Sequence, residues 1–325
     1  MRANWWLAAA MAAVFAMPVY AQMGGEDGGT DGGSEDATDM FKNTDSDGDG
    51  KVTLDEVKKA RAEFTKAQRA AAEADDYDKA IEEVWEKHGN KISADTFLMW
   101  DGDDDLTLTR KEYDAGWNGE SEAEMSDKDY TTLGDVNFDE IAAEHDTDKD
   151  GKIGRDELVA SAKKMRDEAV KKAGDDQKKR RNAIKAYSVG GVLREQLVAD
   201  LDGDGVLTRE EYRTYAKKYY TGEIENYQPT GKNLEVFKAE MLDEVLMVFD
   251  ADKDGLVSRK EIEDAGEKMD DDEWKKLDKD GDGKLDKKEL SAALFEEEAD
   301  SEPSEPPEPK KEEKDDGEDD DDDMG

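Results

Sequence analysis

Asp45-Ser46-Asp47-Gly48-Asp49-Gly50-Lys51-Val52-Thr53-Leu54-Asp55-Glu56 is the stretch from which the rest of the chain is best interpreted. Carboxylates stand at its positions 1, 3, 5 and 12. A hard divalent cation takes about six to eight oxygen ligands from carboxylates, a backbone carbonyl and water. The stretch offers six candidate ligand residues: Asp45, Asp47 and Asp49 through carboxylates, Lys51 through its carbonyl, Thr53 through a bridging water and Glu56 through two oxygens.

Three other positions give this stretch its expected shape. Gly50, at position 6, permits the positive φ that turns the backbone around an ion. Val52, at position 8, can form a short strand by which two such loops pair. Thr53 and Glu56 have the spacing of a capping box, so a helix should begin after position 9.

The same spacing returns five more times along the chain. The further candidate ligands are Asp101, Asp103, Asp105, Thr107, Thr109 and Glu112; Asp146, Asp148, Asp150, Lys152 and Glu157; Asp200, Asp202, Asp204, Val206, Thr208 and Glu211; Asp250, Asp252, Asp254, Leu256, Ser258 and Glu261; and Asp278, Asp280, Asp282, Lys284, Asp286 and Glu289. Six copies with glutamate at position 12 and an apolar residue at position 8 are too many for an accident of acidic composition. One copy departs, because Leu106 stands where the others have glycine at position 6.

This pattern resembles the EF-hand calcium loop, and the resemblance covers most of residues 36–295. It implies an all-α fold of tandem helix-loop-helix units with short β pairing between the loops. It also implies about six bound Ca²⁺ ions. Together with the N-terminal segment described below, the chain resembles exported multi-EF-hand calcium-binding proteins and, more distantly, the reticulocalbin and calumenin family.

Charge and composition narrow the classes of function. The chain carries 89 acidic and 47 basic residues, for a net charge of −42, and the six loops use only 24 of those acids at their carboxylate positions. Such a chain should repel nucleic acid and attract cations and basic partners. It has no cysteine and two histidines, and no nucleophile elbow, phosphate loop or histidine–carboxylate arrangement. We therefore expect no enzymatic activity.

Both ends of the chain have compositions unlike the middle. Residues 1–21 have a basic start and a 13-residue apolar run, Trp5–Met17, which indicates a cleaved signal peptide. We expect an exported protein (secreted, periplasmic or at the cell surface) with no membrane span after cleavage. Residues 22–36 form a glycine- and aspartate-rich linker, and residues 296–325 an acidic tail that should be disordered.

The loops divide the middle of the chain into three expected units. Residues 37–145 hold loops 45–56 and 101–112, residues 146–249 hold loops 146–157 and 200–211, and residues 250–295 hold loops 250–261 and 278–289. The first two units are a tandem repeat, because Asp45 and Asp146 are 101 residues apart and Asp101 and Asp200 are 99 apart.

The long spacing inside the first two units has two interpretations. In the first, degenerate loops accompany the intact ones, and the strand pairs are Val52 with Ile92, Leu108 with Val136, Ile153 with Val192 and Leu207 with Leu234. In the second, Ser93 and Asn137 are N-caps of short helices that lead into the next loop. The first interpretation also pairs Val257 with Leu285, the one pair that would have two complete loops.

Two functions are compatible with these features. The first is a calcium buffer or calcium-stabilised binding protein; the second is a calcium-switched interaction module that exposes an apolar groove to a protein partner. Grooves of such switches are typically rich in methionine. Here the methionines are scattered, which favours the first function: Met40, Met99, Met125, Met165, Met241, Met247 and Met269.

Overall fold

The computed structural model of the chain describes residues 39–120, 124–224 and 228–295. The expected signal peptide, linker and acidic tail lie outside the described residues. Over the described ranges, helices are joined by loops and by three two-stranded sheets. The predicted all-α class with short β pairing is confirmed. No helix in these ranges is long and apolar enough to cross a membrane.

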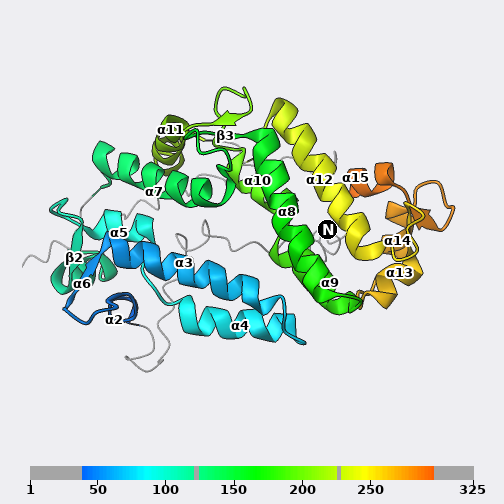
Figure 1. The fold of residues 1–325 in the computed structure, drawn as a ribbon, viewed down its shortest axis with the longest axis horizontal. Coiled ribbons are helices and arrows are strands. Elements are labelled where there is room, and N and C mark those ends of the chain that lie inside the picture. The colour runs from blue at the N-terminus through cyan, green and yellow to red at the C-terminus, as the bar shows by residue number, and fades with distance from the viewer. Residues whose placement is uncertain (1–38, 121–123, 225–227, 296–325) are drawn as a thin grey trace, which may run out of the picture.

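Helices make up most of the described chain (Figure 1). They are α2 (Met40–Thr44), α3 (Leu54–Ala71), α4 (Tyr77–His88), α5 (Ala94–Trp100), α6 (Arg110–Trp117), α7 (Asp127–His145), α8 (Arg155–Ala173), α9 (Gln177–Ala186), α10 (Val189–Gln196), α11 (Arg209–Tyr220), α12 (Gly231–Phe249), α13 (Arg259–Asp264), α14 (Asp271–Leu277) and α15 (Lys287–Phe295). The strands are β1 (Lys51–Thr53), β2 (Thr107–Thr109), β3 (Ile153–Gly154), β4 (Val206–Leu207), β5 (Val257–Ser258) and β6 (Lys284–Leu285).

Helix starts follow the capping pattern of the sequence. Thr53 caps α3, its side chain accepts from the Glu56 N–H, and the Glu56 side chain accepts from the Thr53 N–H. The same reciprocal box opens α6, α11 and α13. Each box satisfies two backbone donors that a helix start leaves unpaired. The glutamate at position 12 is thereby held by the helix that leaves its loop.

The strand pairs show that complete loops pair with each other. Val52 lies opposite Leu108, Ile153 opposite Leu207, and Val257 opposite Leu285, all antiparallel. The last pair confirms the expectation. The four pairings predicted with degenerate loops are wrong, because three of the supposed partner residues lie inside helices and Ile92 lies just before one.

The supposed degenerate loops have other roles. Ser93 is the N-cap of α5, as the alternative interpretation predicted, and Ile92 is buried with its N–H donating to Thr44 Oγ1 at 2.9 Å. Asn137 is not an N-cap: it lies within α7 and accepts from Arg61 Nη1 at 2.7 Å. Gly190 lies in α10, where a Cβ would come within 2.4 Å of Met241 Sδ, so its glycine serves helix packing.

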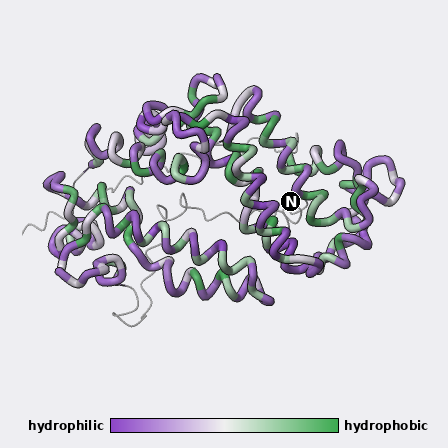
Figure 2. The backbone as a smooth tube through the Cα atoms, viewed as in Figure 1, coloured by the Kyte–Doolittle hydropathy of each residue, from purple (hydrophilic) through white to green (hydrophobic). Residues whose placement is uncertain are grey.

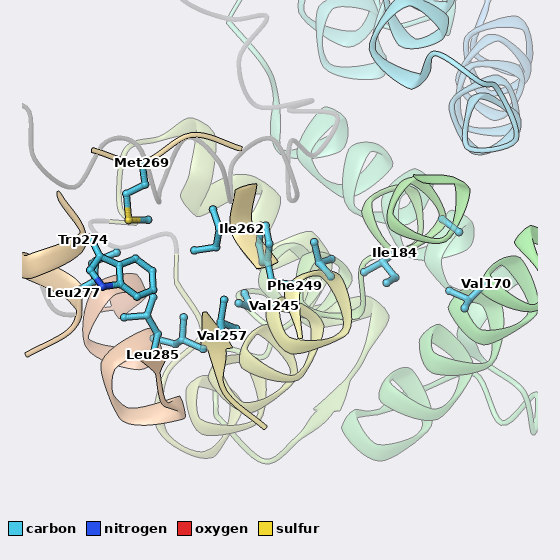
Figure 3. Close-up of a cluster of buried hydrophobic side chains, with 13 residues drawn as sticks. Val170, Ile184, Val245, Phe249, Val257, Ile262, Met269, Trp274, Leu277 and Leu285 are labelled. Carbon is cyan, nitrogen blue, oxygen red and sulfur yellow. The ribbon is translucent and has the colours of Figure 1, made fainter. Parts of the chain in front are cut away.

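Each loop pair sits on its own cluster of buried side chains. The first cluster surrounds Val52 and Leu108, the second Ile153 and Leu207, and the third Val257 and Leu285. In Figure 3 the third cluster runs from Trp274 of α14 past Val257 and Leu285 to Ile184 of α9 and Val170 of α8. Figure 2 shows the alternation of hydrophilic and hydrophobic residues along the helices that makes this burial possible.

Two long helices connect successive clusters. Helix α7 contributes Leu133 and Val136 to the first cluster and Phe138 and Ile141 to the second. Helix α12 contributes Phe237 and Met241 to the second and Val245, Val248 and Phe249 to the third. Each of these helices enters the first loop of the following pair, so the three pairs are joined by continuous helix rather than by free linkers.

Candidate metal centres

All six loops are turned by the same backbone hydrogen bond. The N–H of the residue at position 6 donates to Oδ2 of the aspartate at position 1, as from Gly50 to Asp45 at 2.9 Å. The other five donor–acceptor pairs are Leu106 with Asp101, Gly151 with Asp146, Gly205 with Asp200, Gly255 with Asp250 and Gly283 with Asp278, at 2.8 to 3.1 Å. The first aspartate therefore closes the loop around the position where the other ligands gather.

Backbone conformation at position 6 is left-handed in every loop. The five glycines there have φ between 84° and 87°, and Leu106 has φ 62°. Position 4 is also left-handed, which the sequence analysis missed. The loops with a side chain there hold Asp104, Lys149 and Lys253 at φ 58–62°. Loop 101–112 alone among the six carries side chains at both positions, so it is the most strained of them.

The glutamate at position 12 lies folded into its loop. Glu56 Oε2 accepts from the Thr53 N–H at 2.9 Å, and Oε1 accepts from the Ser46 N–H at 2.7 Å. Burial raises the pKa of this carboxyl, but the backbone hydrogen bonds from Thr53 and Ser46 outweigh it and hold the pKa below its usual range. The pKa values of Glu157 and Glu261 are lowered in the same way. These carboxyls are therefore ionised at neutral pH, as candidate cation ligands must be.

The ligand oxygens of the loops crowd together. Ligand atoms lie within 4.8 Å of one another in each of these sets: Asp45, Asp47 and Glu56; Asp101, Asp103 and Glu112; Asp146, Asp148 and Glu157; Asp200, Asp202 and Asp204; and Asp250, Asp252 and Asp254. Like charges at such distances repel each other strongly unless a cation lies between them. At Asp101, which is 3% exposed, burial and then the charges of Glu112 and Asp105 raise the pKa, against hydrogen bonds from Leu106 and Asp105.

Two buried carboxylate oxygens in these loops have no hydrogen-bond partner. They are Asp146 Oδ1 and Glu211 Oε1. A buried anionic oxygen without a donor costs free energy, and a bound cation removes that cost. The donor set consists entirely of hard oxygens, which suits Ca²⁺. The residues therefore fit the ion that the sequence pattern implies.

Known protein families agree with this geometry. The EF-hand family model matches residues 145–160, 197–214, 242–264 and 275–295, which hold loops 146–157, 200–211, 250–261 and 278–289. The chain belongs to the EF-hand superfamily. A model of the EF-hand domain pair matches residues 20–59, which include loop 45–56. The loop with Leu106 lies outside these matched ranges.

In an EF hand the carbonyl at position 7 is also a ligand. In four of the six loops the residue at position 7 is the first residue of a strand. Lys51 starts β1, Thr107 β2, Val206 β4 and Lys284 β6. Strand pairing thus fixes the direction of the carbonyl. The remaining position-7 residues, Lys152 and Leu256, directly precede β3 and β5. Pairing between two EF hands therefore positions a ligand in each.

One charged contact at these EF hands could not be read from the loop pattern. The ammonium of Lys284, at position 7 of the sixth loop, forms an ion pair with the carboxylate of Asp254, at position 5 of the fifth. This pairing lowers the pKa of Asp254 and raises that of Lys284. The contact forms because β5 and β6 are paired. The charge of Lys284 from the sixth loop thus lies beside Asp254, a candidate ligand of the fifth.

Proposed function

We propose that this EF-hand protein is an exported, non-enzymatic calcium-binding protein whose six loops bind Ca²⁺ as buffering or stabilising sites. The crowding of ligand oxygens in the loops is the observation that carries the proposal. The loops already hold the left-handed turns and the inward glutamates of a closed site. The folded loops thus present their candidate ligands to an ion in one place.

Charge supports a stabilising role for the ions. Six Ca²⁺ ions would bring twelve positive charges to a chain of net charge −42 and leave −30. Each ion at a concentration about 100 times its dissociation constant stabilises the folded form by about 2.7 kcal/mol. Over several sites this is comparable with the total stability of a domain, about 5–15 kcal/mol. Because the chain has no cysteine, disulfides do not contribute.

The arrangement of exposed apolar side chains favours a buffer over a switch. The large exposed ones in the described ranges are Trp85, Met99, Trp117, Leu201, Tyr220 and Met247. They belong to five different helices and one loop, whereas a sensor gathers such residues into one groove. A calcium-switched module that binds an apolar partner is the alternative function.

Calcium titration by calorimetry on residues 22–325 tests the proposal. We expect about six saturable sites, and each of Glu56→Gln, Glu157→Gln, Glu211→Gln, Glu261→Gln and Glu289→Gln should weaken one site by loss of the two-oxygen ligand. Fewer than four saturable sites at physiological salt would contradict it. Fluorescence of a dye that binds apolar surface separates the two functions: a large increase on calcium addition would favour the switch.

Export is supported by the sequence of residues 1–21. Expression of the full chain with its own N-terminus, followed by N-terminal sequencing of the mature product, tests it. We expect the protein outside the cytoplasm, beginning at Gln22. A product retained in the cytoplasm and beginning at Met1 would contradict export without affecting calcium binding.

A further inference from the structure

A residue outside every twelve-residue loop reaches a ligand of the fourth. Asn233 lies near the start of α12 and is 1% exposed. Its Nδ2 donates to Asp200 Oδ2 at 2.6 Å, and the same oxygen accepts from the Gly205 N–H at 2.8 Å. The first candidate ligand of loop 200–211 is therefore held by two donors. One is a backbone N–H of its own loop, and the other is a side chain of helix α12.

The amide of Asn233 is oriented by Arg155. Arg155 Nη1 donates to Asn233 Oδ1 at 2.7 Å. Because a guanidinium only donates, it selects the carbonyl oxygen and turns the amide NH₂ toward the carboxylate. The Arg155 N–H also donates to the carbonyl of Gly205 at 2.7 Å. Arg155 stands at position 10 of loop 146–157, so the contact joins the third EF hand to the fourth.

Gly205 leaves the space that this arrangement needs. A Cβ on Gly205 would lie 2.9 Å from Arg155 Cζ, closer than such atoms approach. Glycine at this position therefore serves two purposes, because it also adopts φ 87°. The polar contact and the loop turn depend on the same missing side chain.

The first repeat has other residues at the positions of this polar contact. Leu54 occupies position 10 there and Leu106 position 6, and both pack against the first hydrophobic cluster. Asp129, at the same distance before the next loop as Asn233, is buried and can only accept when ionised. The first repeat therefore lacks the arginine, the glycine and the asparagine that make this contact in the second.

We propose that Asn233 is a positioning residue for the calcium site of loop 200–211 and that Arg155 orients it. The proposal rests on calcium binding at this loop, as proposed above. A contact that fixes a ligand carboxylate in the folded loop lowers the cost of ordering that ligand around the ion and so stabilises the calcium-bound form. Contacts that orient a metal ligand in this way typically change affinity by about 10- to 100-fold when removed.

The amide resonances of the position-6 glycines provide a probe for each loop. Gly205 reports loop 200–211, whereas Gly50, Gly151, Gly255 and Gly283 report other loops. Titration of residues 22–325 with Ca²⁺, followed by NMR, gives a midpoint for each. In Asn233→Ala we expect the Gly205 midpoint to rise by about tenfold. Gly50 and Gly283 should stay within about twofold.

The matched control removes another buried asparagine. Asn182 lies in α9, is 5% exposed and donates to the carbonyl of Ala74 instead of to a loop ligand. Asn182→Ala should leave the Gly205 midpoint unchanged. Equal Gly205 midpoints in Asn233→Ala and the parent would overturn the proposal. So would an equal rise at Gly205 and Gly50, because that result indicates general loss of stability.

Arg155→Met tests the same contact through a second residue. It should raise the Gly205 midpoint in the same direction, and the double variant should add little, because the two residues act through one contact. Full additivity would overturn the role of Arg155. If Gly205 in the parent gives no calcium response and Glu211→Gln changes nothing, this loop does not bind calcium, and the inference falls with the proposed function. Equal Gly205 midpoints in Asn233→Ala and the parent overturn the inference alone.

Discussion

Val52 lies directly opposite Leu108 in the β1–β2 pair, although the two residues are 56 positions apart. In the third pair Val257 and Leu285 meet at half that separation. Helices α3, α4 and α5 form between the first two loops and return the chain to the partner strand. Long insertions are tolerated because the entropy of loop closure grows only slowly with length. Complete loops therefore pair with each other in both units, although the number of residues between the two loops differs.

Leu106→Gly should strengthen calcium binding at loop 101–112. Leu106 has φ 62°, a conformation that costs a residue with a side chain about 1–2 kcal/mol, so its removal should raise affinity by about tenfold. In the calcium-saturated protein the gain in stability should be partly offset, because Leu106 packs on the first cluster and glycine is freer when unfolded. Calorimetry and chemical denaturation measure the two effects. A loss of affinity would show that the strain does not limit binding.

Local features of the loops are well predicted from sequence. These features depend on residues close in sequence or on a short spacing between loops. They are the positive φ at Leu106, the helix caps at Thr53 and Thr109, and the pairing of Val257 with Leu285. The pairing of Val52 depends on a residue far along the chain. A single sequence does not distinguish the distant Leu108 of a complete loop from the nearer apolar residue Ile92. Its partner was therefore predicted wrongly.

Contacts between elements were not predictable in the same way. Asn233 and Asp200 are 33 residues apart, and the asparagine directly precedes Leu234, which was expected to pair with Leu207 as part of a degenerate loop. Only the packing of α12 beside loop 200–211 brings the amide to the ligand. Lys284 and Asp254 meet for a similar reason, through strand pairing. No fixed spacing in the sequence relates the residues of these two contacts, so the sequence alone does not predict that they meet.

Lys284→Met should increase calcium affinity at loop 250–261. The substitution removes a positive charge from beside Asp254 and keeps the backbone carbonyl of residue 284. We expect a gain of about three- to tenfold at low ionic strength, which salt should reduce. Lys260→Met is the control, because Lys260 pairs with Asp264 on α13 instead of with a loop ligand. Equal effects of the two variants would mean that only net charge matters.

Gly134→Ala should separate α7 from α11, which lie side by side (Figure 1). A Cβ on Gly134 would come within 2.5 Å of Arg213 Cα, and backbone atoms cannot move aside as a flexible side chain can. We expect a loss of about 1–3 kcal/mol in the free energy of unfolding, larger than alanine's advantage of about 1 kcal/mol in a helix. Chemical denaturation of the parent and the variant at the same saturating Ca²⁺ concentration measures it. Gly154→Ala, with its nearest contact at 3.9 Å and φ −67°, should cost little.

Removal of calcium should disrupt most of the tertiary structure. The crowded carboxylates then repel each other in a chain of net charge −42 without disulfides. We expect excess chelator to abolish most of the near-ultraviolet circular dichroism of the buried aromatic residues and the cooperative thermal transition, and added Ca²⁺ to restore both. Mg²⁺ at the same concentration is the control for general screening. An apo protein with the same sharp transition as the calcium-bound form would contradict this expectation.

Loss of the fourth site should weaken the fifth through α12. Asn233 joins the start of this 19-residue helix to Asp200, and its last residue precedes Asp250, the first ligand of the fifth loop. A continuous helix of this length spans about 28 Å. Fixing the start of α12 at the fourth loop therefore also restricts the motion of its end at the fifth loop. Glu211→Gln should therefore raise the calcium midpoint of the Gly255 amide by about fivefold, a typical coupling.

Two comparisons separate this coupling from a general effect. Glu112→Gln disables a loop in the first pair, whose hydrophobic cluster includes no described residue of α12, and should leave the Gly255 midpoint unchanged. In Asn233→Ala the contact between α12 and Asp200 is already lost, so Glu211→Gln should have little further effect on Gly255. A Gly255 midpoint that is the same in the parent and in Glu211→Gln would show that the two sites bind independently, because a helix that transmits order must change the affinity at both of its ends.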